Sequence, residues 1–251
     1  MSDRDGVYGQ DGHRVKLRWG RRGATAGAEA GEILVIVDTL SFSTAVTIAL
    51  ENGAVVWPAA TEAEAAARAA EVGAEVAVSR RDVPQRGRFS LSPSTWTGVE
   101  PGTRVVLPSP NGSTLARLGE SAPVVLLGCL RNSWACAVAA RKLGFELGVP
   151  ISVLAAGERW PDDQGLRFSV EDLIGAGAII TAIDLAASPE ARAARAAFEA
   201  ARGDLAAVLS DSGSGRELIA GGFADDVRHA ARLDVTTVIP RLTDGRFEAL
   251  R

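Results

Sequence analysis

The sequence predicts an α/β protein, a three-layer α/β/α fold with a largely parallel or mixed sheet. Two observations carry this prediction. Short apolar runs alternate along the chain with alanine-rich helical runs, and residues 33–37 (ILVIV) are apolar throughout. A continuous apolar strand is typical of a sheet covered on both faces. Repeated strand–helix alternation places parallel strands between layers of helices.

Length and composition favour an ordinary globular chain. The 251 residues include 27 basic and 31 acidic side chains, which gives a formal net charge of −4, and 47% are hydrophobic. We expect one domain over residues 1–251, with room for two intimately packed subdomains, because no convincing linker divides the chain. The mild acidity argues against a nucleic-acid backbone or an anionic membrane as the main partner.

Two further features bear on the compartment. The cysteines, Cys129 and Cys136, form neither a disulfide scaffold nor a zinc set. The first residues are polar without a signal-peptide pattern, and no apolar run reaches the roughly 18 residues of a membrane span. We therefore expect a cytoplasmic, soluble protein.

The first half of the chain begins with a short strand at residues 15–18. Residues 20–31 are rich in Gly and Ala and are interpreted as a loop with one helical turn at most. Ser43 or Thr44 is expected to cap a helix that ends at Glu51, and Thr61 to open a helix over residues 62–72 through a capping box. Strands are expected at residues 33–37, 55–57 and 75–78, followed by an arginine-rich loop over 79–97.

The second half repeats the alternation. Strands are expected at residues 104–107, 124–127 and 151–155, with a short helix after residue 113 and one from Asn132 to 147. Ser169 opens a long helix to about residue 186, and Ser188-Pro189 starts another, where proline at the first turn costs no hydrogen bond. Helical segments near 216–220 and 226–231 precede a last strand at 236–239 and a short polar terminus.

Several common catalytic signatures are absent from the sequence. No G-x-x-x-x-G-K-[S/T] phosphate loop is present, and the pair Gly175 and Gly177 follows a helix start without the third glycine of a dinucleotide fingerprint. Only His13 and His229 are histidines, and both lie outside the expected strand-end loops. A triad centred on histidine is therefore disfavoured. Carboxylates, hydroxyls, small turns and arginines remain as the chemical groups.

In parallel sheets, ligands bind beyond the carboxyl ends of the strands. That rule selects residues 38–44, 79–81, 109–113, 130–132 and 157–159. Asp38 follows the buried strand and could hold a divalent cation, orient a nucleophile, or simply cap a turn. Glu171 and Asp172 fall in a first helical turn, where capping and compensation of the helix dipole are the alternative to metal binding.

Residues 79–88 carry four arginines: Arg80, Arg81, Arg86 and Arg88. One interpretation is a solvated surface loop. The other is a mobile cover over an anionic substrate, because guanidinium groups bind phosphate and carboxylate through paired N–H donors.

The chain resembles the 2-phosphosulfolactate phosphatases over roughly residues 34–239. Five short segments carry the resemblance, in the order of the family: DTLSFST at 38–44, SPNGS at 109–113, NSWACA at 132–137, AG at 156–157 followed by SVEDLIGAG at 169–177, and a tail at 210–227 that includes Asp226. Each segment is short, but five in the right order are fairly specific.

The resemblance implies magnesium-dependent hydrolysis of a small anionic phosphate monoester. It makes Asp38, Glu171 and Asp172 the candidate catalytic residues, and Asp38, Asp172 and Asp226 the candidate metal ligands. The candidate substrate- and phosphate-binding residues are Ser43, Thr44, Arg80, Arg81, Asn111, Gly112, Ser113 and Asn132. The only partner expected is the phosphorylated substrate, and a homodimer is an assembly that the sequence leaves open.

Three positions depart from the family pattern. Ser41 stands where the family has an arginine, Ser79-Arg80 replaces Gly-Glu, and Leu91-Ser92-Pro93 replaces Asn-Ser-Pro. We expect either a preference for a less anionic ester or a guanidinium group of Arg80 or Arg81 placed beside Ser41. The alternative function is a diverged, non-catalytic anion-binding protein of the same fold.

Overall fold

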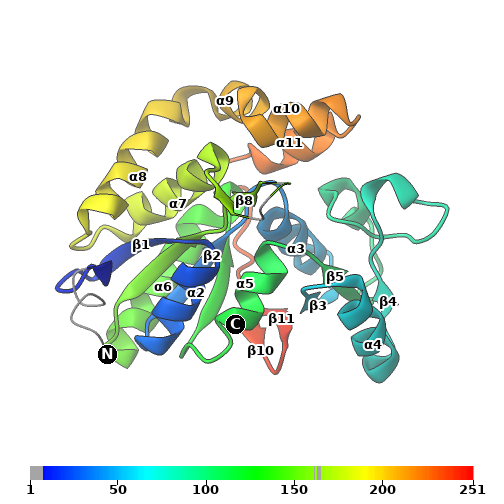
Figure 1. The fold of residues 1–251 in the computed structure, drawn as a ribbon, viewed down its shortest axis with the longest axis horizontal. Coiled ribbons are helices and arrows are strands. Elements are labelled where there is room, and N and C mark those ends of the chain that lie inside the picture. The colour runs from blue at the N-terminus through cyan, green and yellow to red at the C-terminus, as the bar shows by residue number, and fades with distance from the viewer. Residues whose placement is uncertain (1–7, 161, 163–164, 251) are drawn as a thin grey trace.

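The computed structural model describes residues 8–160, 162 and 165–250. Nine strands form one mixed sheet, in the order β1-β7-β2-β6-β10-β11-β3-β5-β4. Helices lie on both sides of it (Figure 1). The predicted three-layer α/β fold is therefore confirmed.

The sheet consists of two parallel blocks joined by an antiparallel hairpin. The first block is β1 (Val15–Trp19), β7 (Ile151–Ala155), β2 (Ile33–Val37) and β6 (Val125–Gly128). The second is β3 (Val55–Ala59), β5 (Arg104–Pro108) and β4 (Glu75–Val76). Between them lie β10 (Pro240–Thr243) and β11 (Arg246–Ala249).

The helices alternate with these strands and then gather at the end of the chain. The helices that follow β1, in chain order, are α2 (Gly20–Glu29), α3 (Phe42–Glu51), α4 (Glu62–Val72), α5 (Gly112–Leu118), α6 (Ser133–Leu147), α7 (Val170–Ile183) and α8 (Pro189–Ala201). Then come α9 (Leu205–Asp211), α10 (Gly213–Ala220) and α11 (Ala224–Ala230). The last four form an arch across the top of the view in Figure 1.

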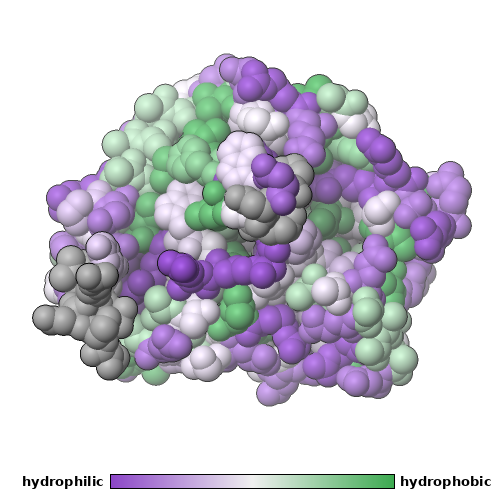
Figure 2. All heavy atoms as spheres, in the orientation of Figure 1, coloured by the Kyte–Doolittle hydropathy of each residue, from purple (hydrophilic) through white to green (hydrophobic). Residues whose placement is uncertain are grey.

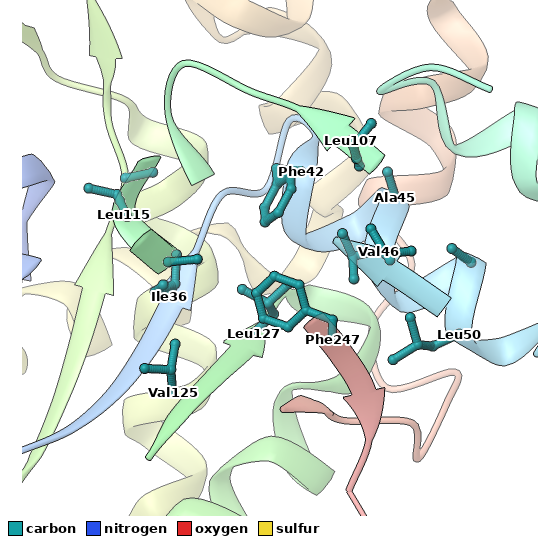
Figure 3. Close-up of a cluster of buried hydrophobic side chains, with 14 of the residues drawn as sticks. Ile36, Phe42, Ala45, Val46, Leu50, Leu107, Leu115, Val125, Leu127 and Phe247 are labelled. Carbon is teal, nitrogen blue, oxygen red and sulfur yellow. The ribbon is translucent and has the colours of Figure 1, made fainter. Parts of the chain in front are cut away.

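Strand β2 lies between two hydrophobic cores. Leu34 and Ile36 point into a cluster with α2, α3 and α5, whereas Ile33, Val35 and Val37 pack against α6 and α7. All five side chains are fully buried, as expected for an apolar run between two layers. Figure 3 shows the first cluster, where side chains of α3 meet those of β6, β5 and β11.

Helix α2 corrects the loop expected over residues 20–31. Its buried face is made of small residues, and an added Cβ at Gly23 or Gly27 would lie within 3 Å of a neighbouring side chain, Leu154 or Leu34 respectively. Glycine here permits close packing of a helix on the sheet. The same composition, taken without its neighbours, resembles a loop, because glycine carries the lowest helix propensity apart from proline.

The C-terminal prediction was also wrong. Residues 236–239 form no regular strand, and the supposed polar terminus is the β10–β11 hairpin in the middle of the sheet. Phe247 pairs with Val56 of β3, and Arg241 pairs with Leu126 of β6. The alternation of polar residues concealed this strand pair, in which Pro240 and Phe247 are the buried residues.

Smaller differences concern the ends of elements. Helix α3 starts at Phe42 with Ser41 as its N-cap, so neither Ser43 nor Thr44 caps it. Asn132 and Ser169 do precede α6 and α7, but neither side chain forms a capping hydrogen bond. Helix α9 was not expected. No helix in the described ranges has the length and apolar character needed to cross a membrane.

Candidate active site

Asp38 joins the loop after β2 to the start of α5. The carboxylate accepts the backbone N–H of Phe42 at Oδ1 (3.1 Å) and that of Gly112 at Oδ2 (2.9 Å). Asp38 is 6% exposed. The segments after β2 and β5, far apart in the strand order, therefore meet at one buried carboxylate.

Asp172 makes a similar connection from the first turn of α7. Its Oδ1 accepts the backbone N–H of Thr39 (2.8 Å), and its Oδ2 accepts that of Gly157 (2.9 Å), which follows β7. The two aspartates thus tie together the loops after β2, β5 and β7. As sequence reasoning predicted, these strand ends converge.

Four acidic side chains are electrostatically coupled at this point: Asp38, Glu158, Glu171 and Asp172. Burial raises the pKa of Asp38, against the opposing effect of its two backbone hydrogen bonds and of Arg80. Burial and the charges of Asp38 and Glu171 hold the pKa of Asp172 well above its usual range. Burial, followed by the charge of Asp38, raises the pKa of Glu158 to about 7. The cluster is therefore short of positive charge.

Glu171 differs from the two aspartates. It is only 2% exposed, and no hydrogen bond to its carboxylate is found in the part of the chain that the structure describes. Its backbone carbonyl accepts a bond from Thr39 Oγ1 (3.1 Å), which fixes the turn that carries it. The Glu171 carboxylate therefore keeps its capacity to accept hydrogen bonds from a bound ligand.

Arg80 places a guanidinium group beside Ser41, the position at which the family pattern has an arginine. Its Nη2 donates to Ser41 Oγ (2.8 Å) and its Nε to Asp226 Oδ2 (2.8 Å), while the guanidinium lies over the ring of Phe223. The expectation of a guanidinium beside Ser41 is confirmed. Arg81 lies beside it in sequence but is exposed.

Asp226, a predicted metal ligand, has both carboxylate oxygens engaged. Oδ2 accepts from Arg80, and Oδ1 accepts a short bond from Ser92 Oγ. Asp226 therefore holds Arg80 in place, and its predicted role as a ligand remains a prediction.

The predicted hydroxyl ligands are used by the fold. Ser43 Oγ, Thr44 Oγ1 and Ser113 Oγ donate to the backbone carbonyls of Ile36, Thr39 and Leu107, all at 2.8–3.2 Å. All three residues are buried. Their hydroxyl hydrogens are thus committed to backbone oxygens, and the structure gives a substrate no direct approach to them.

The two predicted amide side chains differ in position. Asn111 Nδ2 donates to Glu158 Oε2 (2.8 Å) and so belongs to the acidic cluster, next to Gly112. Asn132 is fully buried, where its Oδ1 accepts from Cys129 N and its Nδ2 donates to Val238 O. Asn132 therefore fixes the end of β6 and makes no bond to the cluster.

Two hollows open on either side of the turn at Pro110. One, of about 530 Å³, is lined by Arg80, Arg81, Ser109 and Phe223 among others. The other, of about 320 Å³, is lined by Arg21, Arg22, Asn111, Glu158 and Arg159 among others. The acidic cluster thus has a basic side chain in the hollow on each side.

Sequence reasoning did not name Glu158 or the arginines at positions 21, 22 and 159 as site residues. Glu158 and Arg159 form the short strand β8 (Glu158–Arg159), directly after the loop that ends β7. Both belong to residues 157–159, which the strand-end rule selects. The acidic side chain of Glu158 was the signal that could have identified it as a site residue. Arg21 and Arg22 lay in the segment interpreted as a loop, so nothing placed them at the end of β1.

Comparison with known proteins shows the family of this chain. The family model described as 2-phosphosulpholactate phosphatase matches residues 22–245. A "Probable 2-phosphosulfolactate phosphatase" of Gloeobacter violaceus is 33% identical over 83% of this chain and 87% of its own length. The "2-phosphosulfolactate phosphatase" of Methanothermobacter thermautotrophicus is 32% identical over 88% of this chain and 92% of its own. The chain therefore belongs to the 2-phosphosulfolactate phosphatase family, whose members are phosphoric monoester hydrolases.

Proposed function

We propose that this protein hydrolyses 2-phosphosulfolactate, or a closely related phosphorylated hydroxy acid, with the help of magnesium. The observation that carries the proposal is the acidic cluster, whose buried members Asp38, Glu171 and Asp172 the strand-end loops assemble beside Arg80. The printed names of the relatives supply the substrate.

The carboxylates of the acidic cluster are compatible with magnesium if water and phosphate oxygens complete its coordination shell. In the described ranges, no three His, Cys, Asp or Glu side chains are arranged to hold a metal ion. Magnesium, however, commonly takes one or two carboxylates and completes its shell with water and phosphate oxygens. Asp38 and Asp172 would supply those carboxylates, and Glu171, which lacks a hydrogen-bond partner, could accept from a metal-held water. Burial and then mutual repulsion raise the pKa values of the aspartates, and a divalent cation would offset that repulsion.

Hydrolysis breaks the bond between phosphorus and the ester oxygen, while the oxygen of water becomes bonded to phosphorus and releases one proton, which restores the protonated acid. When bound, magnesium supplies positive charge that offsets the charge of the transferring phosphoryl group. Arg80, anchored by Asp226, adds a second positive charge on the side of Ser41. The ester oxygen needs a proton as it leaves, and Glu158, whose pKa lies at about 7, can deliver one near neutral pH.

The test is release of inorganic phosphate from a panel of phosphorylated hydroxy acids, with magnesium or with a chelator. We expect 2-phosphosulfolactate to be hydrolysed with magnesium only. Equal turnover in the chelator would refute the magnesium part of the proposal. Binding of 2-phosphosulfolactate without phosphate release under either condition would instead favour the non-catalytic anion-binding protein. The placement of Arg80 beside Ser41 speaks against that alternative, because it restores the charge lost from the family motif.

The remaining expectations from the sequence stay predictions. They are a cytoplasmic location and the absence of a nucleic-acid partner, and a homodimer is an assembly that stays open.

A further inference from the structure

The smaller hollow beside the acidic cluster is unusually basic. Its volume is about 320 Å³, and three arginines line it: Arg21 and Arg22 in the first turn of α2, and Arg159 in β8. Figure 2 shows a strip of hydrophilic side chains on this face, over the region that α2 and α5 occupy in Figure 1. Three guanidinium groups in one small hollow are a strong attractant for anions.

Glu158 is the acidic side chain that lines this hollow beside the three arginines, so the protein offsets their positive charge only in part. Within residues 8–160, 162 and 165–250, no hydrogen bond or ion pair engages the side chain of Arg21 or Arg22. Burial and then the charge of Arg21 lower the pKa of Arg159, against the opposing charge of Glu158, so two guanidinium groups lie close to each other here. Arg159 Nη2 donates to the carbonyl of Pro110, which orients its guanidinium. By contrast, Arg80 on the other side is already paired with Asp226.

The hollow and the acidic cluster share residues. Asn111 and Glu158 line the hollow, bond to each other, and adjoin Gly112, whose N–H is held by Asp38. A small molecule that reaches from the cluster past Asn111 therefore enters the arginine-lined space.

The position of Arg21 and Arg22 is set by close packing. Gly20 has a φ of +55°, and an added Cβ at Gly23 would lie 2.9 Å from Arg18 Cβ. Because α2 sits this close to β1 and β7, its first turn is held at the carboxyl ends of these strands. The two arginines are thus presented by a fixed element, and each can bind an anion with less loss of freedom than a loop residue.

We infer that this hollow binds the second anionic group, sulfonate or carboxylate, of a substrate whose phosphate lies at the acidic cluster. The inference rests on the proposed function. It adds that Arg21, Arg22 and Arg159 select substrates with an anion beyond the phosphate. A monoester without that anion would leave the guanidinium groups solvated and would gain nothing from them.

A binding measurement tests the subsite independently of turnover. Calorimetry with sulfolactate, the dephosphorylated skeleton, should show binding to the wild type that weakens by about 10-fold or more in Arg21→Ala/Arg22→Ala, the loss expected for a charge-assisted hydrogen bond. Arg202→Ala is the matched control, since Arg202 is an exposed arginine at the end of α8, paired with Glu199. Equal affinity in the wild type and the double variant, or no binding to the wild type, would overturn the subsite.

Kinetics then separate the subsite from the proposed function. For 2-phosphosulfolactate, the double variant should raise KM with little change in kcat, whereas for 2-phospholactate, which lacks the sulfonate, the change in KM should be smaller. The same KM change for both substrates would count against recognition of the sulfonate and would assign the arginines to the carboxylate. Wild-type protein that binds sulfolactate but hydrolyses neither ester would refute the proposed function and leave the subsite standing.

Discussion

Asp38 and Asp172 each use both carboxylate oxygens to hold backbone N–H groups of other segments. This arrangement positions the carboxylates rigidly and leaves the remaining lone pairs of each oxygen for a cation. Asp38 was predicted from its place after a buried strand. Its partner Gly112 belongs to a segment 74 residues away, so the sequence alone did not contain the bond between them.

Replacing Asp38 with asparagine should abolish magnesium-dependent turnover. The amide lacks the charge that holds the cation, and its NH₂ group would also face a backbone N–H of Phe42 or Gly112. We expect a loss of about 1–3 kcal/mol in the free energy of unfolding from the unmatched donor. Phosphate release and urea unfolding measure the two effects. Asp225→Asn, at an exposed residue of α11, is the control, and wild-type turnover in Asp38→Asn would remove Asp38 from the site.

Arg80→Ala should raise KM for an anionic ester by about 10- to 100-fold, the effect of one charge-assisted bond. It also leaves the buried Asp226 unpaired, so the variant should melt at a lower temperature. Arg81→Ala, at the exposed neighbour, is the matched control and should change KM little. Adding Ser41→Arg to Arg80→Ala restores the arginine of the family motif and should recover much of the affinity. Failure of that rescue would show that Arg80 does not replace the missing side chain.

Glu158 should make the fold less stable as pH rises. In the unfolded chain the carboxyl ionises near its ordinary pKa of 4.5, whereas in the folded protein the pKa is about 7. Between these values the folded state binds more protons, so the free energy of unfolding falls as pH increases. Glu158→Gln removes this dependence and should gain about 3 kcal/mol in the free energy of unfolding, relative to the wild type, between pH 4.5 and 8.

Urea unfolding at both pH values, in the presence of a chelator, measures this gain. The exposed Glu29→Gln in α2 is the control. A constant difference between wild type and Glu158→Gln at the two pH values would contradict the raised pKa.

At the scale of elements, most strands and helices were predictable because each carries its own periodicity. The strand ILVIV and the helix opened by Thr61 are examples, and Thr61 does accept the N–H of Glu64. Helix α2 was missed because its glycines act through contact with Leu34 and Leu154, neighbours that the local sequence does not reveal. For the same reason Arg21 and Arg22 were not predicted as site residues, since they lie in the first turn of that helix.

Gly112 in α5 is a second position where a neighbouring side chain leaves no space for a Cβ atom. An added Cβ would lie 2.2 Å from Cδ1 of Phe42, a side chain buried in the core. Gly112→Ala should therefore displace Phe42 or the start of α5 and cost about 1–3 kcal/mol of stability. It should also lower activity, because the Gly112 N–H that positions Asp38 would move. Thermal unfolding and phosphate release check both effects.

Gly203→Ala serves as the control, since nothing lies within 4 Å of its added Cβ. If Gly112→Ala matched the Gly203 variant in melting temperature and turnover, close packing at α5 would not constrain the site.

At the scale of the whole molecule, the site depends on how the two parallel blocks of the sheet are held together. Asp38 follows a strand of the first block, and Gly112 follows a strand of the second. The strand order places the β10–β11 hairpin between the blocks. The last residues of the chain thus join the two halves whose loops form the acidic cluster. A pattern of alternating polar residues gives no indication of such a long-range role.

A substitution at Phe247 tests how the β10–β11 hairpin holds the two blocks of the sheet together. Phe247 is fully buried, its ring lies 6.0 Å from that of Phe42, and it meets Leu127 and Val46 in the same cluster (Figure 3). Truncation to alanine should cost about 3–5 kcal/mol, as for other buried aromatic residues. Phe145→Ala, at a 59% exposed position of α6, should cost less than about 0.5 kcal/mol.

The structure also leads us to expect that Phe247→Ala loses activity at a lower temperature than it loses its fold. Because Phe42 contacts Phe247 and its N–H bonds to Asp38, loosening this contact should reduce activity below the temperature at which the sheet unfolds. Phosphate release and near-UV circular dichroism followed over the same temperature range measure the two processes. We expect activity to decline first in Phe247→Ala and both signals to decline together in Phe145→Ala. Coincident curves in both variants would show that the hairpin stabilises the fold without positioning the site.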